Sequence, residues 1–290
     1  MRMGPTAWRR SRWSRMRRPL WRAFQYAAMA LAGLIALFPL YWMLISSIKT
    51  AQELQRLPPT WWPAELIVQA YSAVFDVLPF SRAIANSFVI AGVTTLAIVF
   101  TSVMAGFVFA KYEFRGRDLL FYAVLSTMFL PPIVMLVPLF RMIQGLGLVN
   151  TYIGVMLPHL ANAFGIFLMR QYTRGVPDEL IDAARVDGAS EWSVVWRVVA
   201  PLSAPAIATL ALFAFVFHWN SFLWPLTVLQ TPDMFTTTIA LNRLVGYTQS
   251  VQFQNVVMAG TAIGILPSIA VFLWLARYYV RGITAGATKG

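Results

Sequence analysis

Cysteine is missing from this 290-residue sequence, and histidine occurs only twice, as His159 and His218. Without cysteine the chain can form no disulfide bond, no thiolate nucleophile and no cysteine-based metal site. The two histidines lie far apart in the sequence, and neither belongs to an HExxH motif or a comparable metal-ligand spacing. We therefore predict no metal site and no enzymatic activity, and we interpret both histidines as polar residues of helix packing.

Lysine is also scarce, and its three positions are Lys49, Lys111 and Lys289. A phosphate-binding loop of the Walker type needs a lysine that follows a glycine and precedes serine or threonine. None of the three lysines has these neighbours. The sequence therefore predicts that this chain binds no ATP, so any ATP hydrolysis linked to its function would take place on a different subunit.

Charged residues make up only 12% of the sequence, whereas hydrophobic residues make up 59% and the mean hydropathy is +0.65. This composition excludes an ordinary soluble globule and indicates an all-α protein that crosses a membrane several times. We interpret the net charge of +12 as a topology signal and an attraction to anionic lipid, not as a sign of nucleic-acid binding.

Six apolar segments are long enough to span a membrane, and they lie at residues 24–48, 83–110, 119–140, 152–169, 203–229 and 255–276. We divide the chain into an arginine-rich tail (1–23), a first helix with its external loop (24–82), a five-helix core (83–276) and a C-terminal tail (277–290). A secretory signal is the competing interpretation of the first segment, but this segment is longer than a signal core and lacks an Ala-x-Ala cleavage site. Pro131, Pro132 and Pro138 should kink or unwind the third span.

Lysine and arginine are distributed unevenly between the two sides that this topology creates. Eighteen of the 23 fall in the tail 1–23, the turn 111–118, the segment 170–197 and the C-terminal tail. Positively charged residues concentrate in the cytoplasmic segments of membrane proteins. We therefore predict that these segments, and both termini, are cytoplasmic.

The middle of every predicted span lacks Asp, Glu, Lys and Arg. Because proton- and sodium-coupled carriers usually keep an ionisable residue there, the absence argues against a secondary carrier. It also favours a neutral solute, since an anion in a low dielectric needs a cationic partner. The predicted spans do contain uncharged polar groups, which can form hydrogen bonds with a sugar or polyol. Their alternative role is to form hydrogen bonds between helices. The candidate pathway residues are Asn86, His159, Asn162, His218, Trp219, Asn220 and Ser221, of which Trp219 could stack on a sugar ring.

A polar stretch, residues 172–201, separates two of the apolar segments, and we name it the polar loop. Pro177 at a first helical position, followed by two acidic residues, is typical of a helix start. Gly188 should end this helix, and Ser190 should cap a second short helix that Pro201 closes. The polar loop is therefore predicted to form two short helices joined by a sharp bend.

The first of these helices carries features of a docking surface. Ala183 and Ala184 are small enough to let another protein approach closely, and the flanking Asp182 and Arg185 can pair at three-residue spacing. We predict that the polar loop docks on a partner protein.

The polar loop resembles the EAA loop of permease subunits of ATP-binding-cassette importers, whose pattern is EAA-x3-G-x9-I-x-LP. The segment 182–184, Gly188 and the segment 198–201 stand at this spacing, with Asp182, Val198 and Ala200 in place of Glu, Ile and Leu. Residues 167–171, 218–220 and 281–287 further resemble the carbohydrate branch of this family, the maltose-type second permease. The resemblance covers about residues 24–290.

The resemblance implies the type I importer permease fold with six transmembrane helices, in the inner membrane of a prokaryote. It implies that the polar loop is a cytoplasmic coupling loop that lies in a groove of an ATPase subunit. The coupling residues would be Asp182, Ala183, Ala184, Arg185 and Gly188. The implied partners are a second permease in a heterodimer, two ATP-binding-cassette subunits that hold ATP and Mg²⁺, an extracytoplasmic solute-binding protein at loop 230–254, and membrane lipid. The tail 283–290 would reach the ATPase interface.

The implied function is import of a neutral sugar or oligosaccharide by alternating access. A permease for glycerol-3-phosphate or glycerophosphodiester substrates is the alternative, because both branches share these motifs. The residues that bind the solute could belong to this chain or, as the alternative, mainly to the partner permease.

Three classes of protein remain, and one set of assays separates them. A permease of an ATP-driven importer predicts that the purified chain hydrolyses no ATP alone and gains ATPase activity only with a partner bound at the polar loop. A stand-alone carrier predicts ion-driven uptake into vesicles that contain only this chain. A membrane scaffold or receptor predicts neither uptake nor partner-dependent ATP hydrolysis.

Overall fold

The computed structural model describes residues 10–247 and 253–287, with side chains described for 21–246 and 253–276. Within these ranges every regular element is a helix, which confirms the predicted all-α class. Most of the arginine-rich tail (1–23) lies outside the described side chains. The whole C-terminal tail (277–290), including the segment 283–290 expected at the ATPase interface, also lies outside them. Helix α1 begins at Arg10, inside the segment predicted as a tail.

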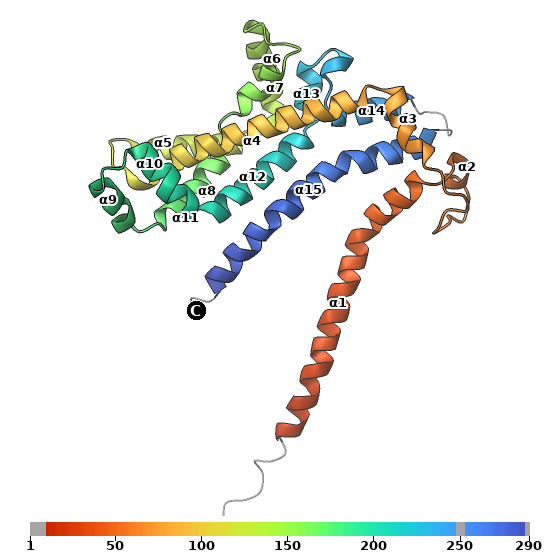
Figure 1. Ribbon diagram of the computed structural model, residues 1–290, viewed down its shortest axis with the longest axis horizontal. Helices are drawn as coiled ribbons and strands as arrows, with labels where there is room; N and C mark the ends of the chain where they lie inside the picture. Colours follow the sequence, from red (N-terminus) through yellow and green to blue (C-terminus); the bar gives the residue numbers. More distant parts are fainter. Residues whose placement is uncertain (1–9, 248–252, 288–290) are drawn as a thin grey trace, which may run out of the picture.

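Within the described ranges, three helices are long and apolar enough to cross a membrane by themselves. They are α1 (Arg10–Ser47), α4 (Phe80–Lys111) and α15 (Gln254–Ala287), and the apolar part of α1 begins at Trp21. Helices α4 and α15 run side by side with α12 (Ala204–Trp219), whereas α1 diverges from this bundle and meets α15 near one end (Figure 1). Little of α1 is therefore buried within this chain.

Three further spans are bent pairs of helices. Residues Arg117–Phe129, which include α5 (Arg117–Ser126), and α6 (Pro132–Gly145) meet at 104°. Residues Tyr152–His159, which begin with α7 (Tyr152–Met156), and α8 (Ala163–Arg174) meet at 46°, and residues Glu191–Leu202 and α12 meet at 85°. When each bent pair is counted as one span, the described residues contain six spans, in agreement with the predicted polytopic six-helix fold.

The breaks move the boundaries of two predicted spans. The third span, predicted at 119–140, breaks at Pro131, whose extended backbone (φ −61°, ψ 129°) caps α6. The fifth, predicted at 203–229, instead pairs α12 with the helical residues before it, α10 (Glu191–Val194), a π-helical turn (Val195–Val199) and α11 (Ala200–Leu202). Proline breaks the helical hydrogen-bond ladder, but the sequence does not show in which direction the chain continues.

Short helices gather at the two ends of the bundle. One end holds α2 (Ala51–Leu54), α3 (Gln69–Val77) and α14 (Thr237–Tyr247), and the opposite end holds α9 (Asp178–Val186), α10 and α11 (Figure 1). We call them the α14 end and the α9 end. Helices α6, α7 and α13 (Leu223–Val228) project to one side of α4.

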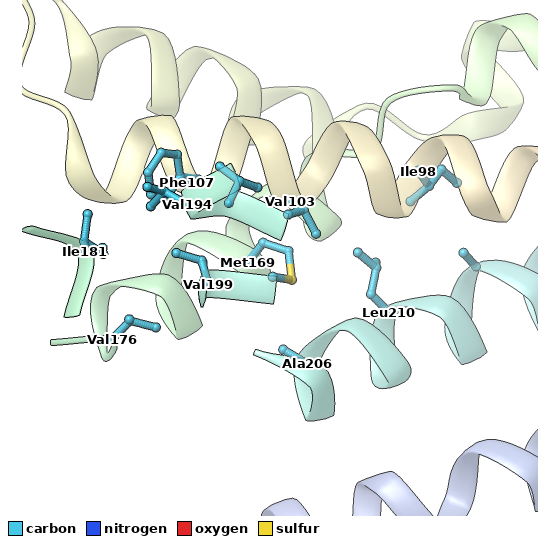
Figure 2. Packing of buried hydrophobic residues seen from close by; sticks show 12 residues of the cluster. Ile98, Val103, Phe107, Met169, Val176, Ile181, Val194, Val199, Ala206 and Leu210 are labelled. Atoms are coloured by element: carbon cyan, nitrogen blue, oxygen red, sulfur yellow. The ribbon is translucent and has the colours of Figure 1, made fainter. Parts of the chain in front are cut away.

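The tightest packing in the bundle joins α4 to α8. A Cβ added to Gly106 of α4 would lie 2.6 Å from the Met169 Cβ and 2.9 Å from the Arg170 backbone nitrogen. Gly165 of α8 approaches Ser102 equally closely. Figure 2 shows side chains of α4, α8 and α12 meeting in the buried cluster beside this contact. Because helices that pack in lipid gain no hydrophobic driving force, small residues at such crossings provide close van der Waals contact.

We expect Gly106→Ala to destabilise the protein by about 1–3 kcal/mol, because the new methyl group overpacks a contact formed by backbone and Cβ atoms. Gly92→Ala is the matched control on the same helix, since an added Cβ there has nothing within 4 Å. Thermal unfolding in detergent measures both, and equal unfolding temperatures for the two variants would contradict this assignment.

Candidate functional site

The polar loop lies at the α9 end and forms the two helices that its sequence predicts. Helix α9 begins at Asp178, with Pro177 as the preceding cap residue and not the first helical residue. Ser190 caps α10, where its hydroxyl accepts a hydrogen bond from the Ser193 backbone N–H at 3.3 Å. Ile181, 1% exposed, anchors α9 in the core cluster of α4, α8 and α12.

Gly188 ends α9 as predicted. Its φ of +83° lies in the left-handed region that other residues adopt only with strain. In this conformation the N–H of Gly188 donates to the Arg185 carbonyl at 3.0 Å, and the N–H of Ala189 donates to the Ala184 carbonyl at 2.9 Å. These two bonds form a Schellman motif, which satisfies the last carbonyls of the helix and turns the chain sharply towards α10.

Arg185 joins the two helices of the polar loop across this bend. Its Nη1 lies 3.2 Å from Asp182 Oδ1, which is the predicted pairing. Its Nε and Nη2 also donate to the two carboxylate oxygens of Glu191, at 2.8 and 3.2 Å, and its guanidinium lies 5.9 Å from the centre of the Tyr112 ring. The hydrogen bond with Glu191 raises the pKa of Arg185, and such a two-point contact has a defined geometry.

Lys111, the last residue of α4, ties that helix to the start of α9. Its Nζ donates to Asp178 Oδ1 and to the Val176 carbonyl, each at 2.6 Å. The lysine side chain is 8% exposed, whereas that of Asp178 is mostly exposed. The sequence marks Lys111 only as one of the positive charges of a cytoplasmic turn. Its contacts with residues more than 60 positions away have no local signal in the sequence.

The remaining surface of α9 is open. Asp182, Ala183 and Arg185 are exposed, and so are the apolar side chains of Leu180 and Val186, the latter by 87%. The α9 helix thus presents small and apolar groups outward while Ile181 and the Arg185 contacts hold its other side.

A cavity of about 620 Å³ lies on the side of the bundle that α6, α8 and α13 enclose. Three candidate pathway residues line it together: His159 and Asn162 from the break before α8, and Ser221 from the break after α12. Asn162 also caps α8, where its side-chain oxygen accepts the Gly165 N–H at 2.9 Å. Within the described part of the chain, no Asp, Glu, Lys or Arg lines the cavity.

Three other candidate pathway residues, Asn86, Trp219 and Asn220, do not line this cavity. Trp219 is 1% exposed and faces the bundle interior, stacked on Phe215, with its Nε1 donating to the Gly264 carbonyl at 2.9 Å. It therefore cannot stack on a solute in this conformation. Asn86 is buried near the α14 end, and the exposed Asn220 bonds the Val216 carbonyl of its own helix.

His218 does not line the cavity, but its ring lies 5.2 Å from that of His159, centre to centre. The two histidines, which are distant in sequence, thus meet where two helices break. No group of three or more possible metal ligands occurs among the residues described.

Sequence reasoning missed the aromatic side chains of the cavity. Phe164, Phe217 and Trp224 line it, and Phe217 is 63% exposed. Trp224 is fixed by a hydrogen bond from its Nε1 to the Val155 carbonyl at 3.0 Å, which joins α13 to α7. The aromatic residues of α12 near His218 were the available signal for this part of the cavity. Because α12 is apolar on all sides, its sequence does not show which aromatic ring faces the cavity.

Comparison with protein families matches residues 99–285 to the "binding-protein-dependent transport system inner membrane component" family. The chain is 36% identical to the arabinooligosaccharides transport system permease protein AraQ of Bacillus subtilis (strain 168), over 89% of this chain and 92% of that protein. It is 33% identical to the lactose transport system permease protein LacG of Rhizobium radiobacter, over 92% of this chain and 97% of that protein. It is 31% identical, with the same coverage, to the sn-glycerol-3-phosphate transport system permease protein UgpE of Escherichia coli O6:H1.

A solved structure has the same fold. It is a bacterial ABC transporter involved in the import of the acidic polysaccharide alginate, and one of its chains superimposes with a TM-score of 0.79 at 24% identity. The superposition covers 93% of this chain and 98% of that one.

We expect Gly188→Val to loosen the end of α9, because a β-branched residue at φ +83° costs about 1–2 kcal/mol. The N–H groups of residues 188 and 189 should then exchange with solvent roughly 5- to 30-fold faster. Gly188→Asn is the control, since asparagine tolerates this conformation. Hydrogen-exchange mass spectrometry of a peptide covering 183–190 measures both, and identical exchange in the two variants would contradict the Schellman assignment.

Proposed function

Because this chain belongs to the binding-protein-dependent transport system inner membrane components, we propose that it is one permease subunit of an ATP-driven importer for a neutral sugar or oligosaccharide. In this proposal a partner ATPase docks on the polar loop. The solute passes along the cavity beside α8 while the transporter alternates between outward-open and inward-open states.

The observation that carries the proposal is the construction of α9. Its Asp182, Ala183 and Arg185 are exposed, but its shape is held by buried Ile181, by the Schellman turn at Gly188 and by the contacts of Arg185. A helix that is rigid yet uncovered can receive a force from a partner and pass it on without deforming. ATP and Mg²⁺ would be held by the partner ATPase subunits.

The lining of the cavity supports a neutral solute. Hydroxyl, amide and imidazole groups of Ser221, Asn162 and His159 alternate there with aromatic rings, and among the described residues no charged side chain contributes. Sugars combine hydroxyl groups with apolar ring faces, so this surface offers both kinds of contact. The relatives named for arabinooligosaccharides and lactose favour this solute class. A glycerol-3-phosphate permease remains the alternative because UgpE is also similar, but a phosphate would need a cation from the partner permease.

The proposed assembly contains a second permease, two ATPase subunits and an extracytoplasmic solute-binding protein. The cavity is not enclosed by this chain alone, and a second permease would complete its wall. The distribution of Lys and Arg supports a cytoplasmic α9 end and cytoplasmic termini. The solute-binding protein would then dock at the α14 end, and lipid would cover the apolar surface of α1.

Ala183→Trp tests the docking role. The residue is exposed, so the chain should fold, but the indole would overpack an ATPase groove by about 1–3 kcal/mol. We expect roughly tenfold weaker ATPase association, since every 1.4 kcal/mol changes an equilibrium tenfold. Co-purification of the ATPase and ATP hydrolysis by the purified complex measure the effect.

Glu113→Trp is the control, because it places the same ring on another exposed residue near the α9 end. Undiminished ATPase association in Ala183→Trp would overturn the proposal. Uptake of arabinooligosaccharide, lactose and glycerol-3-phosphate into proteoliposomes of the parent complex would identify the solute class.

A further inference from the structure

We propose that α4 is the rod that transmits movement between the polar loop and the loop of residues 230–236 at the α14 end, which we call the far loop. Lys111 fixes one end of the rod and Asn86 fixes the other. The proposal rests on the proposed function in one respect, that an ATPase moves the polar loop. It adds a path through this chain and assigns a positioning role to two residues.

At the α9 end, the last residue of α4 and the cap residue that follows it contact both helices of the polar loop. Lys111 bonds Asp178 Oδ1 and the Val176 carbonyl at the start of α9, at 2.6 Å each. The next residue, Tyr112, lies beneath the Arg185 guanidinium, which in turn holds Glu191 of α10. Because the Lys111 side chain is nearly buried, leaving it without a partner would be costly. A displacement of α9 therefore moves the end of α4.

Helix α4 is suited to carry that displacement without bending. It runs unbroken for 32 residues, about 48 Å at the usual helical rise. Its sequence contains no proline, whereas α15 contains Pro267 and α12 is separated from the helical residues before it by an 85° bend. It also packs against both α8 and α12. Kinks in helices arise at proline and at interruptions of the hydrogen-bond ladder, and α4 has neither.

At the α14 end, Asn86 clamps the far loop to α4. Its Nδ2 donates to the carbonyls of Asp233 and Phe235, at 2.8 and 2.9 Å, and its Oδ1 accepts from the Tyr152 hydroxyl at 2.7 Å. The neighbouring Ser87 accepts the N–H of Thr237, the first residue of α14, at 2.8 Å. Asn86 is 4% exposed.

The Asn86 amide is buried, its bond to the Phe235 carbonyl is buried, and its bond to the Asp233 carbonyl is partly buried. Separating the far loop from α4 would leave two carbonyl acceptors and a side-chain amide unpaired, and buried polar groups without partners are unfavourable. The far loop must therefore follow α4 when α4 moves. Coupling between two sites is reciprocal, so a protein that docks on the far loop also biases the position of the polar loop.

The chain has no cysteine, so a single Gln230→Cys substitution on the exposed start of the far loop can report its position. The complex containing this chain is purified and placed in nanodiscs, either without nucleotide or trapped with ATP and vanadate. The labelling rate of residue 230 by a polar maleimide is then compared between the two states. We expect trapping to change the rate about fivefold or more in the parent.

In the Gln230→Cys background, Lys111→Met and Asn86→Leu should each reduce the difference in labelling rate between the two states to less than about twofold. Such a difference is smaller than typical coupling between two sites. Arg115→Met and Asn242→Leu are the matched controls. Both remove the same kind of group from exposed residues that make no hydrogen bond or ion pair within the described chain, and both should keep the full change. Lys111→Arg keeps the positive charge, so it should show the full difference in labelling rate. A Lys111→Met complex that still hydrolyses ATP is folded, so its smaller difference in labelling rate would not come from a folding defect.

The outcomes separate the two proposals. A parent complex without ATPase activity would overturn the proposed function and this inference with it. A parent that hydrolyses ATP but shows no labelling change, or variants at Lys111 and Asn86 that keep the full change, would overturn the inference and leave the proposed function standing. Equal losses in the control variants would also overturn it, because the effect would then not be specific to the two ends of α4.

Discussion

The close contact between α4 and α8 is the constraint on which the functional geometry of this permease depends. At Gly106 and Gly165 the two helices approach so closely that neither position has room for a methyl group. Helix α8 begins at the cavity, with Asn162 as its cap, and leads at its other end into the polar loop. Because α8 cannot shift on α4 without losing this contact, the cavity and the polar loop keep a defined spacing.

The apolar interior of the helix bundle determines where charged groups can lie. A charged group inside the bundle must have partners, and Arg170 of α8 illustrates this. Its Nε donates to the Phe109 carbonyl at 3.1 Å, its Nη2 lies 3.3 Å from Asp118, and its guanidinium lies 3.8 Å from the centre of the Phe121 ring. Such contacts occur at the helix ends, where Lys111 and Arg185 also lie. Among the described residues, the cavity between the two ends is lined by uncharged groups alone.

Local signals made the polar loop predictable. The left-handed turn at Gly188, the cap at Ser190 and the pair of Asp182 with Arg185 each depend on residues within five positions of one another, and the structure contains all three. The cavity was predictable only in part. His159, Asn162 and Ser221 do share it, but Trp219 points into the bundle and Phe217, two residues earlier, points to the cavity. Helix α12 is apolar all round, so its sequence does not show which side faces the other helices.

The sequence by itself determined the all-α class, the number of apolar segments, the membrane environment and the polar loop with its bend. All of these follow from composition and from contacts between near neighbours in the chain. The tertiary structure decided where the broken helices turn, which polar residues meet in the cavity, and that Lys111 and Asn86 bind segments more than 60 residues away. These features depend on how rigid helices pack against one another. If the point where two helices cross moves by one residue, different side chains of each helix face the partner helix.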